Sequence, residues 1–244
     1  MKLFQRIFVA AVLAGLAAGL LMSAIQQWRV VPLILAAEAY ETADAPAAHT
    51  HEHTEATAHT HEHDAQAWAP QDGAQRTGFT VLADVLASMG FALLLVALSV
   101  LVRIDITVQN GVLWGLGGWL SLHLAPAFGL PPELPGMPAA DLVARQLWWF
   151  GTALATGGAL LLVAKLRSPV AIGVAAVLIL VPHLIGAPAA PEAESTVPAH
   201  LATAFAASAL TASALFWLLV GPLIGYFAQR LARAEHPTLA KAIA

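Results

Sequence analysis

The chain has 244 residues, of which 59% are apolar and only 11% are charged, with a mean hydropathy of +0.73 and a formal net charge of −4. A soluble domain carries roughly 25% charged residues, so this composition excludes an ordinary soluble protein and indicates a polytopic membrane protein. The chain has no cysteine, which excludes disulfides, thiolate ligands and thiol nucleophiles. Its basic residues are scattered rather than clustered, so nothing indicates nucleic-acid binding.

The first apolar run extends from residue 7 to residue 25 and follows two basic residues. We expect a retained transmembrane helix, because the apolar core of a cleaved signal peptide is usually about 7–15 residues long. Cleavage near Ala37-Glu38-Ala39 is the alternative. Gly15 and Gly19 stand four residues apart, which suits close helix packing in lipid. Trp28 and Arg29 then mark the membrane boundary, as aromatic and basic residues often do.

A histidine-rich tract follows, within a polar stretch from residue 42 to residue 77 that has no apolar periodicity. The unit His-Thr-His-Glu-His occurs twice, and its histidines are His49, His51, His53, His59, His61 and His63. Imidazole and carboxylate groups are ligands that borderline divalent metals prefer. We therefore expect a disordered loop that gathers metal, the alternative being a disordered linker without a metal role.

Five more apolar runs follow, and they cover residues 79–102, 111–128, 146–164, 169–188 and 201–227. Each is about as long as the roughly 20 residues needed to cross a bilayer, where the backbone must satisfy its own hydrogen bonds. The glycine-rich run 111–128 could be broken or re-entrant. The sequence therefore predicts an all-α fold, a polytopic membrane helical bundle with about six transmembrane helices. We expect one integral membrane domain over residues 1–244, with the loop 42–77 inserted between the first two spans.

Six spans place both termini on one side of the membrane. With the termini inside, eight of the eleven basic residues are cytoplasmic, and only Arg29, Arg76 and Arg145 are outside. This arrangement satisfies the positive-inside rule. We therefore expect a multi-pass protein of the bacterial inner membrane with cytoplasmic termini and a periplasmic histidine-rich loop.

Several lone ionisable residues lie in or just beyond the outer parts of the predicted spans, and these are Glu38, Asp84, His123, His183 and His200. Ionisable groups inside a membrane are costly, so each is a functional candidate. If the helices bundle, Asp84, His123 and His183, with Glu38, could converge on one metal-receiving site below the loop. The alternative is that each caps a helix end or reaches the interface alone. His123 and His183 also precede prolines, which free backbone carbonyls that can coordinate cations.

No enzyme signature is complete in the chain. The histidine tract begins like the zinc protease pattern but lacks its second histidine at the required position, and no glycine-rich loop could cradle a phosphate. We therefore expect neither an enzyme nor a protein with an organic cofactor.

Distinctive segments are spread over nearly the whole chain, and they are residues 32–41, the Ala-Trp-Ala-Pro at 67–70, residues 122–136, the Ala-Arg-Gln-Leu-Trp-Trp at 144–149, and the Pro-His-Leu-Ile-Gly-Ala-Pro at 182–188. Together they resemble the CbtA family, the probable cobalt transporter subunit of bacteria. The proline-rich part of 122–136 and the run 182–188 are the most specific. The resemblance implies cobalt uptake linked to cobalamin synthesis, and a small partner subunit, CbtB, with one span and its own histidines.

The sequence thus predicts a transporter subunit in the lipid bilayer that takes up a divalent metal cation as its substrate. We expect Co²⁺, with Ni²⁺ or Zn²⁺ as alternatives. The loop cannot set this selectivity, because nitrogen ligands favour nickel or copper over cobalt. The alternative function is a non-transporting membrane protein that binds metal and presents it to another transporter.

Overall fold

The computed structural model describes residues 3–43, 70–191 and 195–235, and these residues contain helices and connections but no strand. In chain order the elements are α1 (Leu3–Ile25), the π-helix η1 (Gln26–Val30), α2 (Val31–Ala43), α3 (Ala74–Val102), α4 (Val108–Trp119), the π-helix η2 (Leu120–Leu124), α5 (Ala125–Ala127), α6 (Leu142–Leu166), α7 (Pro169–Ile185) and α8 (Ala199–Glu235). The predicted all-α fold is confirmed. The histidine tract, residues 49–63, lies outside the described residues.

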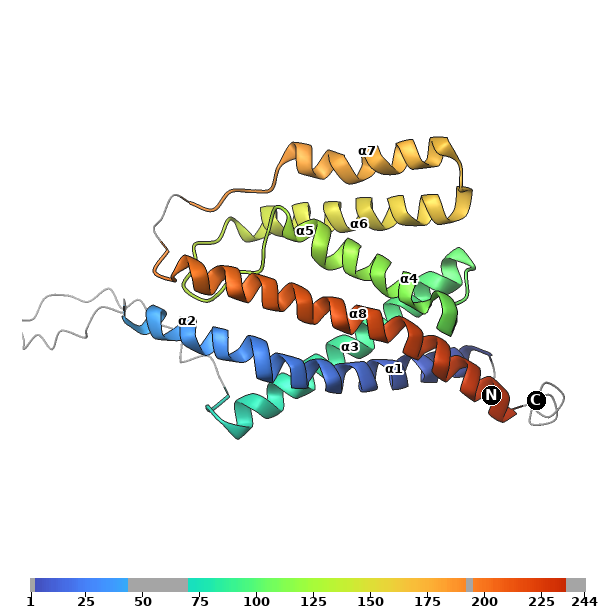
Figure 1. Ribbon diagram of the computed structural model, residues 1–244, viewed down its shortest axis with the longest axis horizontal. Coiled ribbons are helices and arrows are strands. Elements are labelled where there is room, and N and C mark those ends of the chain that lie inside the picture. The colour runs from blue at the N-terminus through green and yellow to red at the C-terminus, as the bar shows by residue number, and fades with distance from the viewer. Residues whose placement is uncertain (1–2, 44–69, 192–194, 236–244) are drawn as a thin grey trace, which may run out of the picture.

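The helices form six runs that alternate in direction, because α1, η1 and α2 are continuous, as are α4, η2 and α5. The start of α1 and the end of α8 lie at the same end of the bundle (Figure 1). Four stretches are long and apolar enough to cross a membrane, and these are Leu3–Tyr40, Ala74–Val102, Leu142–Leu166 and Ala199–Ala234. α7 is a shorter apolar helix. The glycine-rich run is a continuous helix whose register changes at η2, rather than a broken one.

The centre of the bundle is held together by close approaches between helix backbones. α1 packs on α3 and α8, and α4 packs on α8. A Cβ on Gly15 would lie 2.5 Å from the Cα of Met89, and one on Gly19 would lie 2.9 Å from the Cα of Val85. Small residues allow such contacts in lipid, where the hydrophobic effect does not drive helices together. The predicted packing role of Gly15 and Gly19 is thus confirmed.

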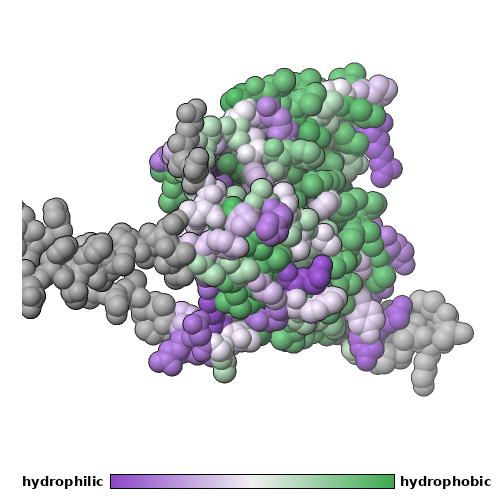
Figure 2. Space-filling view, turned by 60° about the vertical axis from the view of Figure 1, so that its left-hand side comes forward, coloured by the Kyte–Doolittle hydropathy of each residue, from purple (hydrophilic) through white to green (hydrophobic). Residues whose placement is uncertain are grey.

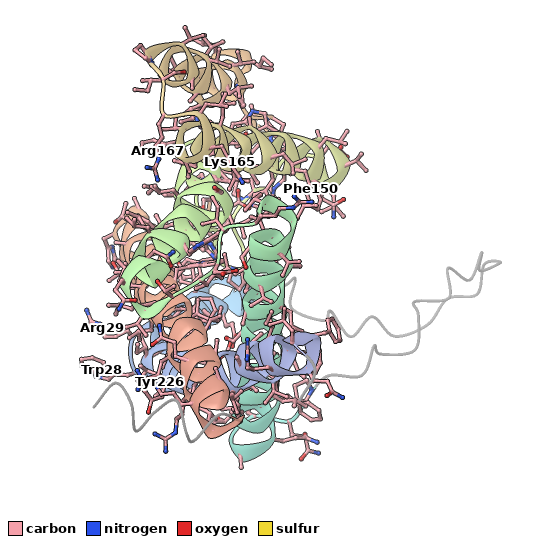
Figure 3. The ribbon with its side chains drawn as sticks, turned by 90° about the vertical axis from the view of Figure 1, so that its right-hand side faces the viewer. Trp28, Arg29, Phe150, Lys165, Arg167 and Tyr226 are labelled. Carbon is pink, nitrogen blue, oxygen red and sulfur yellow. The ribbon has the colours of Figure 1, made fainter. Side chains whose placement is uncertain are left out.

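The outside of the bundle is apolar, above all over α6 and α7, as the green upper part of Figure 2 shows. On these helices Leu154 is 74% exposed and Leu184 is 81% exposed. α7 has 17 residues and packs mainly on α6. The basic side chains of Lys165 and Arg167 lie where α6 turns into α7, at the end of the bundle that faces the viewer in Figure 3.

The opposite end of the bundle carries a separate small apolar cluster, which we call the end cap. Its buried residues are Ala37, Leu134, Val197 and Leu201, and they join α2, the proline-rich segment after α5, and the start of α8. Arg145 of α6 also pairs with Glu133 of that segment, at 2.7 Å between Nη2 and Oε2. The end cap therefore fixes the connection between α5 and α6 over this end of the bundle.

Candidate functional site

A cavity of about 780 Å³ lies between the α4–η2–α5 run, α6 and α7. It is lined by Leu120, Leu124, Ala125, Phe128, Gly129, Trp148, Thr156, Leu160, Ile179, His183, Gly186 and Ala187. Along α6 this lining extends from Trp148 to Leu160, or ~18 Å at the rise of an α-helix. The cavity therefore reaches from the end of the bundle that carries the end cap to beyond the middle of α6.

His183 is the ionisable residue among those that line the cavity. Its ring lies edge-on to Phe128 and Trp148, with centroids 6.1 and 5.8 Å away. The indole Nε1 of Trp148 donates to the carbonyl of Pro182 at 3.1 Å, which ties the last turn of α7 to α6. The half-buried imidazole is thus held beside the part of the cavity nearest the end cap.

His123 has different surroundings, in η2 and against the core. Its Nδ1 accepts a hydrogen bond of 3.1 Å from Nε1 of Trp217, a side chain that is fully buried. Its ring lies edge-on to those of Trp217 and Phe91. A neutral imidazole that accepts at Nδ1 carries its proton on Nε2. His123 could therefore give Nδ1 to a metal only after Trp217 had released it.

Asp84 lies on α3 against η1. Its Oδ1 accepts from Nε2 of Gln26 at 2.9 Å, whereas its Oδ2 is buried and has no hydrogen-bond partner. Burial of an unpartnered carboxylate oxygen is costly. The buried side chain of Ser23 also lies beside this carboxyl, so Asp84 joins α3 to both α1 and η1.

Glu38 of α2 forms an ion pair with Arg76 of α3, and Arg76 also pairs with Asp72 at 3.2 Å. This contact bridges the helices that precede and follow the histidine loop. His200 is exposed at the start of α8. Within the described ranges no three histidine, aspartate or glutamate residues lie close enough to hold a metal. Asp84, His123, His183 and Glu38 are thus in separate surroundings rather than in one group, and their place in a transport path stays a prediction.

Other polar features could not be inferred from residue types. The hydroxyls of Thr152 and Thr156 on α6 are buried and have no hydrogen-bond partner. Each π-helix also ends two residues before a proline, η1 before Pro32 and η2 before Pro126. Single-turn π-helices occur frequently at functional sites. The two prolines are the sequence feature from which the π-helices could have been predicted, since a proline removes one helical hydrogen bond.

Comparison with known proteins gives a family for this bundle. The family model CbtA, described as a probable cobalt transporter subunit, matches residues 4–229. No curated protein and no solved structure matches the chain. The matched residues include all of the six helical runs except the first residue of α1 and the last turns of α8, together with the histidine loop and every residue that lines the cavity. This helical chain matches the family model over nearly its whole length and has several helices able to cross a membrane, so it belongs to the CbtA family of probable cobalt transporter subunits.

Proposed function

We propose that this chain is a subunit of an uptake system for a divalent metal cation, with Co²⁺ as the substrate and cobalamin synthesis as its destination. The observation that carries the proposal is the cavity, which holds one imidazole near the end cap and reaches the middle of the bundle. A cation could enter at that end and lose part of its hydration shell inside. No catalytic role is part of the proposal.

The histidine tract, residues 49–63, gathers metal at the mouth of this path. In support, α2 ends and α3 begins at the same end of the bundle as the end of α7 (Figure 1), and His183 and Gly186 at the end of α7 line the cavity. A loop of weak nitrogen ligands raises the local metal concentration without choosing among metals, because the Irving–Williams order does not favour cobalt. His183 would then be the first imidazole inside the bundle, with Asp84, His123 and Glu38 as further candidates along the path.

We infer the orientation in the membrane from the distribution of basic residues. The end opposite the end cap carries basic residues near the ends of several helices, and these are Arg6, Arg103, Lys165, Arg167, Arg230 and Arg233. The positive-inside rule would place this end in the cytoplasm of a bacterium and the loop in the periplasm.

The partner in this proposal is a small single-span subunit of the CbtB kind. In support, the family is one of transporter subunits, and a subunit works with a partner protein. The exposed apolar face of α7 offers an intramembrane surface, since Val170 is 75% exposed and Leu184 is 81% exposed.

Flux through reconstituted vesicles tests the proposal. The purified chain, alone and with its small partner, is placed in liposomes, and the entry of Co²⁺, Ni²⁺, Zn²⁺ and Mn²⁺ is measured. Saturable Co²⁺ entry that empty liposomes lack is the expected result. Metal binding without flux under both conditions would reject transport and favour a protein that presents metal to another transporter.

Deletion of residues 49–63 tests the role of the loop separately. We expect slower uptake at limiting cobalt, equal uptake at saturating cobalt and an unchanged order of preference among the four metals. The matched control is a loop of equal length in which only the six histidines are replaced by glutamine. Unchanged uptake at limiting cobalt in both variants would remove the loop from the mechanism.

A further inference from the structure

α7 packs mainly on α6, at one edge of the bundle (Figure 1). Its last turn is tied to α6 by the hydrogen bond from Trp148 to the carbonyl of Pro182. Just after that turn, Ala187 lies so close to Gly129 that a methyl group on this glycine would lie 2.7 Å from the Cβ of Ala187. Away from this end, the cavity separates α7 from the α4–η2–α5 run. The cavity is therefore a gap between helices that the described side chains leave open.

The lining of this gap offers few hydrogen bonds to water. Thr156 lines it, but the oxygen of its hydroxyl is buried. Trp148 lines the outer end beside His183, and its Nε1 already donates to a carbonyl. A buried water needs two to four polar partners, so the inner part of the cavity suits an apolar occupant. The aliphatic side chains of that part are Leu120, Leu124, Leu160 and Ile179.

The dimensions of the cavity distinguish two apolar occupants, a transmembrane helix and a lipid chain. A volume of about 780 Å³ over the ~18 Å from Trp148 to Leu160 gives a mean cross-section of ~43 Å². An α-helix with its side chains is ~10–12 Å wide, or ~80–110 Å² in cross-section, and is too thick. An acyl chain is a single file of methylene groups, and one leaflet of the hydrocarbon core is ~15 Å deep. Both the width and the length of the cavity therefore favour an acyl chain.

Lipid can reach the cavity from the side. The cavity is open rather than enclosed, and its lining residues on α6 lie within the candidate membrane span Leu142–Leu166. Phe128 at its edge is 78% exposed, and the surface over α6 and α7 is apolar (Figure 2). An unfilled gap would cost its lining dispersion contacts, and acyl chains are the apolar material that surrounds these helices.

We propose that the cavity is a binding site for a phospholipid acyl chain, which joins α7 to the α4–η2–α5 run. The ester end of the chain lies near His183, where the lining is most polar, and its terminal methyl group lies near Leu160. This site goes beyond the proposed function and does not depend on it. It also bears on that function, because a chain in the cavity closes the proposed cation path and must move aside when a cation passes.

Photocross-linking in vesicles tests the site. The full-length chain is reconstituted in vesicles of phosphatidylethanolamine and phosphatidylglycerol, in which some phosphatidylglycerol carries a diazirine midway along one acyl chain. Labelled residues are then located by mass spectrometry after illumination. We expect labels on Leu120 or Leu124 of η2, in addition to labels on exposed side chains such as Leu154 from the surrounding lipid. The η2 labels should be lost in Ile179→Trp, because the larger side chain fills the cavity.

The matched control is Leu180→Trp, at the next position of α7. Leu180 is 54% exposed and is not among the residues that line the cavity, so this variant should keep the η2 labels. A second pair serves if Ile179→Trp does not insert into the membrane. Leu160→Trp should lose the η2 labels, whereas Leu154→Trp, at a position that is 74% exposed, should keep them.

The outcomes separate the lipid site from the proposed function, because Co²⁺ flux is measured on the same vesicles. Labels confined to exposed side chains in the parent, or equal η2 labels in the parent and in the cavity-filling variants, would overturn the lipid site. Loss of the η2 labels in Ile179→Trp with normal flux would sustain the site and place the cation path outside the cavity. Labels on η2 in a parent that gives no flux would sustain the site and reject transport.

Discussion

The hydrogen bond between His123 and Trp217 gives the sharpest test of how the core is held. His123→Ala leaves the Nε1 of Trp217 without its acceptor in a position that is 0% exposed. A buried donor without a partner costs about 1–3 kcal/mol. We therefore expect His123→Ala to lower the free energy of unfolding by about that amount. His123→Asn should lose less, because its Oδ1 is attached to Cγ as the imidazole Nδ1 is and can accept the same bond.

A double-mutant cycle separates this bond from the change in packing. The variants are His123→Ala, Trp217→Phe and the combination, with unfolding by SDS in mixed micelles followed by helical circular dichroism. Inside membranes such hydrogen bonds have coupling energies of about 0.6 kcal/mol on average and at most about 1.7 kcal/mol, so a value in this range is expected. His200→Ala, at an exposed site, is the control and should change nothing. A coupling energy near zero, with His123→Asn as unstable as His123→Ala, would refute the reasoning.

Three further outcomes follow from the packing and from the path. Gly115→Ala should reduce the yield of monodisperse protein in size-exclusion chromatography, because the added methyl would overlap the carbonyl oxygen of Trp217, whereas Gly158→Ala, whose methyl meets nothing within 4 Å, should not. Asp84→Asn keeps an acceptor for the side-chain amide of Gln26 in η1 but removes the negative charge, so vesicle uptake of Co²⁺ should fall while resistance to unfolding by SDS stays the same. Normal uptake would show that Asp84 serves only to join α3 to η1. His183→Ala should slow Co²⁺ uptake without loss of membrane insertion, and a normal rate at limiting cobalt would remove this imidazole from the path.

The positions of the helices could be predicted because apolar runs and the charges that stop them are local signals. The second run was expected to end at residue 102 and does so, since Arg103 follows it. The first run was expected to stop near Ile25, but the helix continues through η1 into α2. The polar residues Gln26 and Gln27 end the apolar run but not the helix, because backbone hydrogen bonds continue through η1, where the N–H of Val31 bonds to the carbonyl of Gln26.

The contacts of the candidate site could not be predicted in the same way, because they join distant parts of the chain. His123 and Trp217 are 94 residues apart, and nothing local to either residue indicates the other. Thr152 and Thr156 read as ordinary helix residues until their missing partners are visible. The sequence singles out Asp84, His123 and His183 by their residue types, but their different contacts come only from the packing of the helices.

The shortness of α7 has a consequence for the lipid around the cavity. Its 17 residues rise only ~25 Å, while the hydrocarbon core of a bilayer is about 30 Å thick. A helix that is too short must thin the surrounding bilayer or recruit a neighbour, at a cost that grows with each ångström of mismatch. α7 supplies one wall of the cavity and packs mainly on α6. The acyl-chain length of the lipid should therefore change the position of α7 relative to α6, and cobalt entry should vary with the thickness of the host membrane.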